Sequence, residues 1–281
     1  MTPKSLISEV GIEATNDLSL RVSVATLNQV LFPHPQNGTM MLALERKATL
    51  LKKQDNNIRV RSQPFGGAVR ILNPAPLQKI VGEIQFDSEE SEREQDFRIL
   101  ISPSNWESVK GYCLQHLENP DDAELESTPH RELVEEFEEA LDVNLRPNQY
   151  TFQPVGFVIE NDPILTDHVD ARGHATVRLY RIFEVYIVDN TLCATLLAAS
   201  QHYSDQDLRT CALKDLENEG KGRANTILTL PLNLIIESYL AFPPENRYRK
   251  IVLENHELDE SVMAILGNVQ VRQYHRVERS V

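Results

Sequence analysis

Three glutamates in the segment from Arg131 to Phe137 have residue types and a spacing suited to binding metal ions. Glu132, Glu135 and Glu136 stand at positions i, i+3 and i+4, so on an α-helix their carboxylates share one face. Like charges at this spacing repel one another, and a bound cation relieves that repulsion. The segment therefore predicts a divalent-cation site on one helix. A solvated acidic face is the alternative that the spacing alone leaves open.

The same segment carries an apolar stripe, which predicts a helix packed against a core. The apolar positions are Leu133, Phe137, Ala140 and Leu141, with Val134 at the edge. Ser127 or Thr128 is expected to cap this helix. Pro129 is tolerated in the first turn because its missing N–H costs nothing there. The helix is expected to end at about Leu141.

Strands are predicted ahead of this helix. Alternating apolar residues at 18–27 and a second run at 40–45 form a hairpin around the turn residues at 33–38. A further short strand at 58–60 leads into Gly66 and Gly67. Two adjacent glycines mark a tight turn or a close approach of two backbones.

Residues 70–125 are predicted to be an insertion between the glycines and the acidic helix. It should contain a solvated acidic loop at 87–95, a short strand at 97–101 and a helix that ends at about Leu117. Ser104 and Glu107 fit a capping box at the start of that helix.

Further strands and helices are predicted after the acidic helix. The strands lie at 153–159, 176–188 and 250–253, and an acidic turn lies at 204–209. One helix is expected to be capped at Thr229 and to end before Phe242, and another is expected at 259–266.

Composition limits the classes of partner. The 281 residues carry a net charge of −14, which argues against a general nucleic-acid or anionic-membrane binder and leaves a small phosphorylated ligand open. The cysteines, Cys113, Cys193 and Cys211, form no disulfide framework and favour a reducing compartment. Residues 1–17 contain no apolar signal core, and the apolar runs are too short to span a bilayer. We therefore expect a cytoplasmic protein.

The order of these features resembles the Nudix family: a hairpin, a strand leading to Gly66-Gly67, a helix with Arg-Glu-Leu-x-Glu-Glu, further strands and a closing helix. The resemblance implies an α+β fold, an α/β/α sandwich with a mixed β-sheet and an insertion before the Nudix helix. It also implies a lead-in at 1–17, a domain at 18–242 that includes the insertion at 70–125, and a C-terminal extension at 243–281.

The resemblance assigns roles on the acidic helix. Glu132, Glu135 and Glu136 match the glutamates that bind Mg²⁺ or Mn²⁺, and Arg131 matches the arginine that orients them. Glu132, Glu135 and Arg131 are then expected to be catalytic. Metal ions held there would neutralise charge on a pyrophosphate and help activate water.

Other site residues follow from the same resemblance. Gly66 and Gly67 match the glycines before the Nudix helix and are expected on the substrate side of the site. The family often uses a further carboxylate from a later loop. Asp207 is the first candidate for this metal ligand and Glu160 the second, although for each a solvated loop acid is the plainer interpretation.

Three departures from the family pattern bear on catalytic activity rather than on the fold. Ala123 stands where a glutamate is expected eight residues before Arg131, and the nearby acids, Glu124 and Glu126, are out of register. Glu138 replaces a glycine near the end of the motif. The segment between the glycines and the helix is also much longer than the family's.

Two functions are therefore expected from the sequence, together with a weaker structural alternative. The first is a metal-dependent hydrolase that cleaves the pyrophosphate bond of a nucleoside diphosphate linked to another moiety. The second is a catalytically inactive, nucleotide-sensing or protein-interaction domain. An unrelated α+β protein with an ordinary acidic helix is the third. The expected partner is a small phosphorylated ligand, a nucleotide derivative, and a homodimer is possible.

Overall fold

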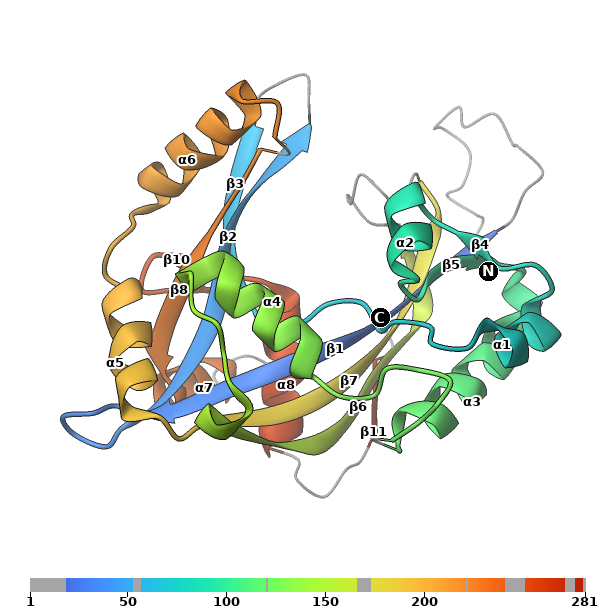
Figure 1. Ribbon diagram of the computed structural model, residues 1–281, viewed down its shortest axis with the longest axis horizontal. Helices are drawn as coiled ribbons and strands as arrows, with labels where there is room; N and C mark the ends of the chain where they lie inside the picture. The colour runs from blue at the N-terminus through green and yellow to red at the C-terminus, as the bar shows by residue number, and fades with distance from the viewer. Residues whose placement is uncertain are drawn as a thin grey trace, which may run out of the picture.

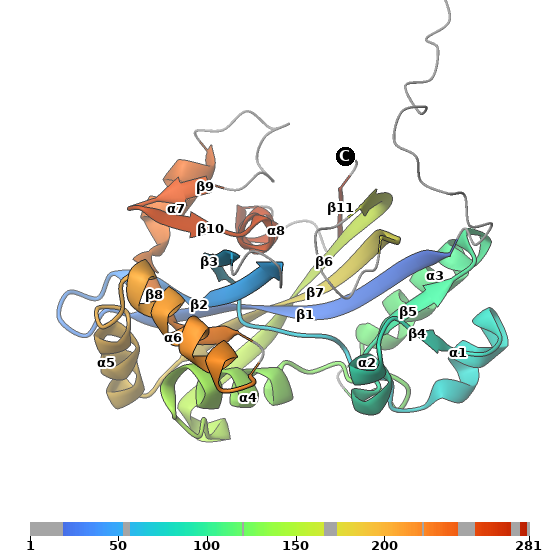
Figure 2. The ribbon, with the colours of Figure 1, turned by 90° about the horizontal axis from the view of Figure 1, so that it is seen from above.

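The computed structural model describes residues 19–52, 57–119, 121–165, 173–220, 222–240, 251–270 and 276–279. Helices lie on both faces of a mixed sheet in which most neighbouring strands are antiparallel (Figures 1 and 2). The predicted α+β class is confirmed.

Eleven strands within the described residues join this sheet. They are β1 (Leu20–Pro33), β2 (Met40–Lys52), β3 (Asn57–Gln63), β4 (Gln85–Phe86), β5 (Arg98–Ile101), β6 (Tyr150–Leu165), β7 (Ala175–Ile187), β8 (Arg223–Pro231), β9 (Ile251–Leu253), β10 (His256–Leu258) and β11 (Arg276–Arg279). The helices are α1 (Pro74–Val81), α2 (Glu89–Glu94), α3 (Trp106–Leu117), α4 (His130–Leu141), α5 (Asn190–Ala199), α6 (Asp205–Glu217), α7 (Leu232–Leu240) and α8 (Glu260–Gln270), with 3₁₀ turns at Pro103–Asn105 and Pro147–Gln149.

Strand β1 is an interior strand of the sheet, between β7 and β2, and in Figure 1 it runs through the centre of the molecule. It pairs in parallel with β7 on one side. On its other side it pairs with β5 near its start and with β2 near its end. Between these two partners the segment 65–68 bridges β1, with Ala25 opposite Ala68 and Asn28 opposite Phe65. Gly66 and Gly67 are therefore held against the middle of the sheet.

Alternating side chains of the long strands build separate cores on the two faces. On one face Leu133 and Phe137 of α4 pack against a buried cluster that includes Val30 and Val185. The insertion covers the other end of this face through α3. On the opposite face α7 and α8 pack on β2, where Leu44 is buried (Figure 2).

The insertion leaves and rejoins the domain at one point, because Ile71 and Leu125 form an antiparallel bridge. Its strand β5 extends the sheet by pairing with β1. The prediction of a solvated loop at 87–95 was wrong. Asp87 is buried and paired with Arg21, and the Ser88 side chain caps α2. Acidic residues in the first turn of α2 complement the helix dipole.

Three predicted helix starts differ from the structure. A 3₁₀ turn at Pro103–Asn105 precedes α3, so the capping box of Ser104 and Glu107 is not formed. Helix α4 begins at His130 behind Pro129, without a side-chain cap, and ends at the predicted Leu141. Thr229 lies in β8 rather than at a helix cap, and α7 follows that strand directly.

Several elements were not predicted, among them α1, α2, α5, β8 and β10, and the acidic turn expected at 204–209 is the start of α6. In the tail, β10 pairs with β3, β11 pairs with β6, and α8 packs on the sheet. The expected lead-in at 1–17 and the residues around Phe242 lie outside the described residues. Within the described chain, no helix is both long and apolar enough to cross a membrane.

The packing of α4 predicts the cost of removing Phe137. Its side chain is fully buried, and its ring centroid lies 5.0 Å from that of Phe65. Phe137→Ala should lower the free energy of unfolding by about 3–5 kcal/mol, because it leaves a cavity between α4 and the sheet. Denaturant unfolding measures this loss, with the exposed Glu138→Ala as control, for which about 0.5 kcal/mol or less is expected. A loss below about 1 kcal/mol for Phe137→Ala would contradict the packing described.

Candidate functional site

Helix α4 forms hydrogen bonds to the segment that contains the two glycines through two of its side chains. Oε2 of Glu136 accepts a hydrogen bond from the Gly66 backbone N–H at 2.5 Å. Nη2 of Arg131 donates to the carbonyl oxygen of Ala68 at 2.9 Å. The contact joins parts of the chain that are separated by the whole insertion.

Both glycines are required by close approaches. Gly66 has a φ of +144°, and a Cβ there would overlap the backbone carbonyl of Thr26 on β1. A Cβ at Gly67 would overlap the carboxylate of Glu132. The glycines thus let α4 lie directly on the segment 65–68. The neighbour of Gly66 is the backbone of β1, and the neighbour of Gly67 is the carboxylate of Glu132.

Arg131 is the centre of the charge network on α4. Its Nε donates to both carboxylate oxygens of Glu126, at 2.9 and 3.1 Å. Its Nη2 lies 2.6 Å from Oε1 of Glu132, and its Nη1 donates to Oε2 of Glu135 at 3.0 Å. One guanidinium therefore orients three carboxylates, as planar bidentate donors can.

Glu126 was not predicted as the partner of Arg131. The family pattern places that glutamate at Ala123, on the assumption of a fixed register between the two residues. In this chain the segment before α4 is not helical, and the bridge between Ile71 and Leu125 presents the next residue, Glu126, to the arginine. Because the segment before α4 is not helical, the number of residues between an acid and Arg131 does not determine whether the two side chains meet.

A fifth carboxylate, Glu45 of β2, lies near Glu136 and was also missed. It is fully buried, where it accepts from Nζ of Lys47 at 3.2 Å and from Nε2 of Gln63 at 2.8 Å. A signal was present in the sequence. Glu45 lies two residues from the buried Ala43, so it shares the strand face that packs toward α4.

Burial raises the pKa of two carboxylates on α4. For Glu136 burial is the main cause, with repulsion from Glu45 next, and its pKa lies well above the usual range although Lys47 and the Gly66 N–H oppose the shift. For Glu132 burial raises the pKa to about 7, while Arg131 lowers it. The site thus holds more buried negative charge than its cations neutralise.

The donor set suits a hard divalent cation, because carboxylate oxygens one helical turn apart are the ligands that Mg²⁺ and Mn²⁺ prefer. In the side-chain arrangement described, Arg131 engages Glu132 and Glu135. Over the described part of the chain, no group of three or more His, Cys, Asp or Glu side chains is placed to hold a metal ion. The chemistry of the donors fits the ion, and coordination requires Glu132 or Glu135 to turn away from Arg131.

The structure does not place Asp207 with the acids of α4. Its Oδ2 accepts from the backbone N–H and the hydroxyl of Ser204, at 2.9 and 2.6 Å, in a capping box at the start of α6. Asp205, two residues before Asp207, pairs with Arg46, whose side chain leaves β2 on the face opposite to Glu45. Asp207 therefore stabilises its own helix.

Glu160 also lies apart from the acids of α4. It is buried on β6 and accepts from Nη1 of Arg178 at 3.0 Å. Its neighbour Ile159 faces the α3 core, so Glu160 points to the opposite side of the sheet from α3 and α4.

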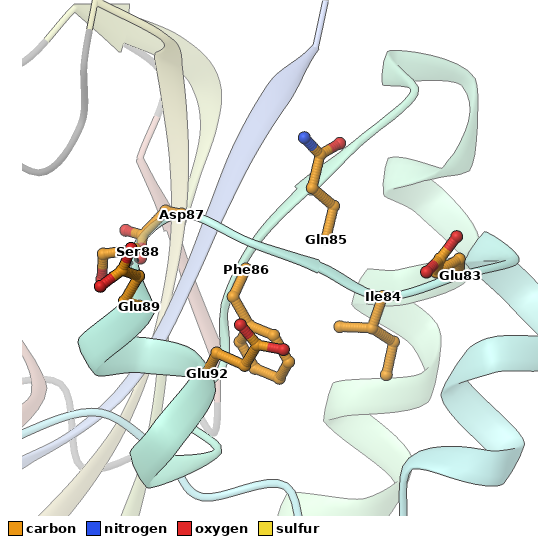
Figure 3. A pocket seen from close by; sticks show the side chains of 8 residues that line it. All are labelled: Glu83, Ile84, Gln85, Phe86, Asp87, Ser88, Glu89 and Glu92. Carbon is orange, nitrogen blue, oxygen red and sulfur yellow. Dashed lines mark hydrogen bonds between the residues drawn. The ribbon is translucent and has the colours of Figure 1, made fainter.

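A hollow of 530 Å³ lies in the insertion, away from α4, and Figure 3 shows its lining. The lining side chains are Glu83, Ile84, Gln85, Phe86, Asp87, Ser88, Glu89 and Glu92. No basic side chain lines it, and its buried acid Asp87 is already paired with Arg21. The hollow therefore does not contribute to the acidic site on α4.

No protein-family model matches the chain, and neither does any of the curated proteins or solved structures with which it was compared.

The close approach of Gly66 to the backbone of β1 predicts that adding a single methyl group there will be strongly destabilising. Gly66→Ala should lower the free energy of unfolding by more than about 2 kcal/mol, because the new Cβ meets backbone of β1 and the left-handed φ is strained. Gly111→Ala in α3 is the matched control, since nothing lies within 4 Å of its Cβ position. There a gain of about 0.5–1 kcal/mol is expected. Equal effects of the two changes, measured by thermal or denaturant unfolding, would contradict the close approach.

The raised pKa of Glu132 predicts how stability depends on pH in EDTA. The groups that act on it are Arg131, which lowers its pKa, and Glu135, Asp96 and Glu126, which raise it. Between pH 4.5 and about 7 the folded chain holds a proton here that the unfolded chain loses. Stability should therefore fall as pH rises through this window, by about 3 kcal/mol from this residue.

Glu132→Gln should remove that part of the pH dependence and be the more stable protein at pH 8, as measured by denaturant unfolding. Glu138→Gln, on the exposed side of the same helix, should leave the dependence unchanged. Identical slopes for wild type and Glu132→Gln would show that Glu132 titrates normally.

Proposed function

We propose that this chain is a metal-dependent hydrolase with a Nudix-like fold, which cleaves the pyrophosphate bond of a nucleoside diphosphate linked to another moiety. The observation that carries the proposal is the contact between α4 and the Gly66-Gly67 segment. One buried and one partly buried carboxylate of the same helix, Glu136 and Glu132, are held against two adjacent glycines, although a long insertion separates these residues in the sequence.

The fold features described above support a Nudix-like architecture. The acidic helix packs on one face of a mixed sheet, α7 and α8 pack on the other, and the glycine segment lies between β3 and the insertion. Ile71 and Leu125 close the base of the insertion, so the long connection does not separate the glycines from α4.

The residues of α4 have distinct roles in this proposal. Glu132 and Glu136 hold Mg²⁺ or Mn²⁺, with Glu135 at the exposed edge of the same face. Arg131, fixed by Glu126 and by the Ala68 carbonyl, positions the carboxylates. When bound, the ion neutralises charge on the phosphoryl oxygens and lowers the pKa of water. Burial of Glu132 and Glu136 strengthens their interaction with a cation by excluding water.

A specific observation favours the second candidate, a Nudix-like domain that binds a nucleotide without hydrolysing it. Arg131 already occupies Glu132 and Glu135, and the described residues form no group placed to hold a metal. If this pairing persists when ligand is present, the site would bind phosphates without activating water.

Turnover measurements separate the two candidates. Wild-type protein is assayed with Mg²⁺ or Mn²⁺ against nucleoside diphosphate sugars and dinucleoside polyphosphates. Glu136→Gln should reduce turnover by more than about 100-fold, since even partners of metal ligands often contribute about 10–100-fold. Glu138→Gln removes the same charge from an exposed position of the same helix and should leave turnover unchanged.

The proposed hydrolase would be contradicted by the absence of turnover on every member of the panel, or by turnover that Glu136→Gln leaves intact. Calorimetry with the same nucleotides then decides the second candidate. Binding without turnover supports it, and the absence of both excludes it.

A further inference from the structure

A single row of side chains crosses the sheet beside α4 and joins the acidic site to a buried arginine. The bridges at Ala25 and Asn28 place Gly67 directly opposite Thr26 on β1. Thr26 is in register with Arg181 on β7. Residues in register on neighbouring strands project on the same face, so Thr26 and Arg181 lie on the side that α4 covers.

Arg181 is an uncommon residue for this position. Its exposed fraction is 7%, and no ion pair of Arg181 is found among the described residues. Its guanidinium carbon lies 4.4 Å from the ring centroid of Phe157 and 5.4 Å from that of Phe183. Burial lowers its pKa to about 10, opposed only by the charge of Glu118. A buried guanidinium that forms no ion pair is costly unless something else pairs with it.

Buried polar atoms of β1, the strand next to this arginine, also lack partners. Oγ1 of Thr26, both amide atoms of Asn28 and Nε of Arg181 are buried and accept or donate no hydrogen bond. Each such atom costs about 1–3 kcal/mol if it stays unpaired. Thr26, Asn28 and Arg181 share one face of the sheet and lie in neighbouring register positions. We call these three residues the polar seam, and it lies between the α3 core and the α4 core.

The seam and the acidic site are close enough for one ligand. Glu132 lies over Gly67, and Arg181 stands two strands further along the same row. Neighbouring strands are about 4.8 Å apart, so the backbone positions of Gly67 and Arg181 are separated by about 10 Å. The guanidinium itself lies over the ring of Phe157, which β6 places beside Arg181. A diphosphate with its attached group spans such a distance.

We propose that Arg181, with Asn28 and Thr26, binds a phosphate group of the same ligand whose other phosphate lies at the acidic face of α4. The proposal rests on the proposed function for the ligand class and adds the residues that recognise its anion. A guanidinium held by two aromatic rings presents planar donors that match phosphate oxygens, and the amide and hydroxyl add neutral donors beside it. Ordered water is the other possible partner of these atoms, and it is an outcome of the test.

The test measures binding of inorganic pyrophosphate by calorimetry in EDTA, which excludes metal-bridged binding. Arg181→Met should weaken the affinity by at least about 10-fold, because it removes the charged donors and keeps the side-chain length. Arg181→Lys should retain part of the affinity. Arg93→Met removes the same charge from the exposed helix α2 and should have no effect.

A stability measurement distinguishes recognition from a structural role. If Arg181 serves a ligand, Arg181→Met should leave the unfolding midpoint of the free protein unchanged or raise it, since a buried unpaired charge is replaced by an apolar chain. Equal pyrophosphate affinity in wild type and Arg181→Met, or no binding by folded wild type, would overturn the proposal and assign the seam to water.

The test of the phosphate site is independent of the test of hydrolysis. Binding in EDTA that depends on Arg181 and survives Glu136→Gln would establish the phosphate site even if no nucleotide is hydrolysed. Turnover that requires Glu136 but is unchanged, in both kcat and KM, by Arg181→Met would keep the hydrolase and remove this phosphate site.

Discussion

The hydrogen bond from the Gly66 N–H to Glu136 is the contact on which the candidate site depends. It fixes α4 on the segment that runs beside β1, and it is possible only because neither glycine carries a Cβ. The apolar stripe of α4 supplies the packing that holds the helix there, with Phe137 buried against Phe65. Packing and the close backbone approach together hold carboxylates of α4 where the surrounding protein excludes water that would otherwise solvate them.

The same contact creates an electrostatic imbalance. Glu132, Glu136 and Glu45 are brought together, whereas the nearby cations are Arg131 and Lys47. Protons relieve the imbalance at low pH, and a divalent cation is the natural means at neutral pH. Two strands away the balance reverses, because the guanidinium of Arg181 is buried and forms no ion pair among the described residues. A sheet row that is acidic at one end and basic at the other matches a ligand that carries phosphates and a metal ion together.

The sequence predicted those features that depend on local patterns. Alternation located the long strands, the apolar stripe located α4, and the pair of glycines indicated a close approach that the structure realises at Gly67. Features set by tertiary pairing were not predicted. Glu126 reaches Arg131 through the bridge at Leu125, and Arg181 acquires its neighbours from the register of β7 with β1 and β6. Helix α5 was missed because its sequence is apolar on most sides and shows no clear period.

The central claim is that the acidic face of α4 binds a divalent cation, and anomalous diffraction from crystals soaked in Mn²⁺ tests it most directly. The account predicts an anomalous peak within about 2.0–2.3 Å of carboxylate oxygens of Glu132 and Glu136, with Glu132 turned away from Arg131. Ordered carboxylates that remain paired with Arg131 and the Gly66 N–H, with no anomalous peak beside them, would contradict it.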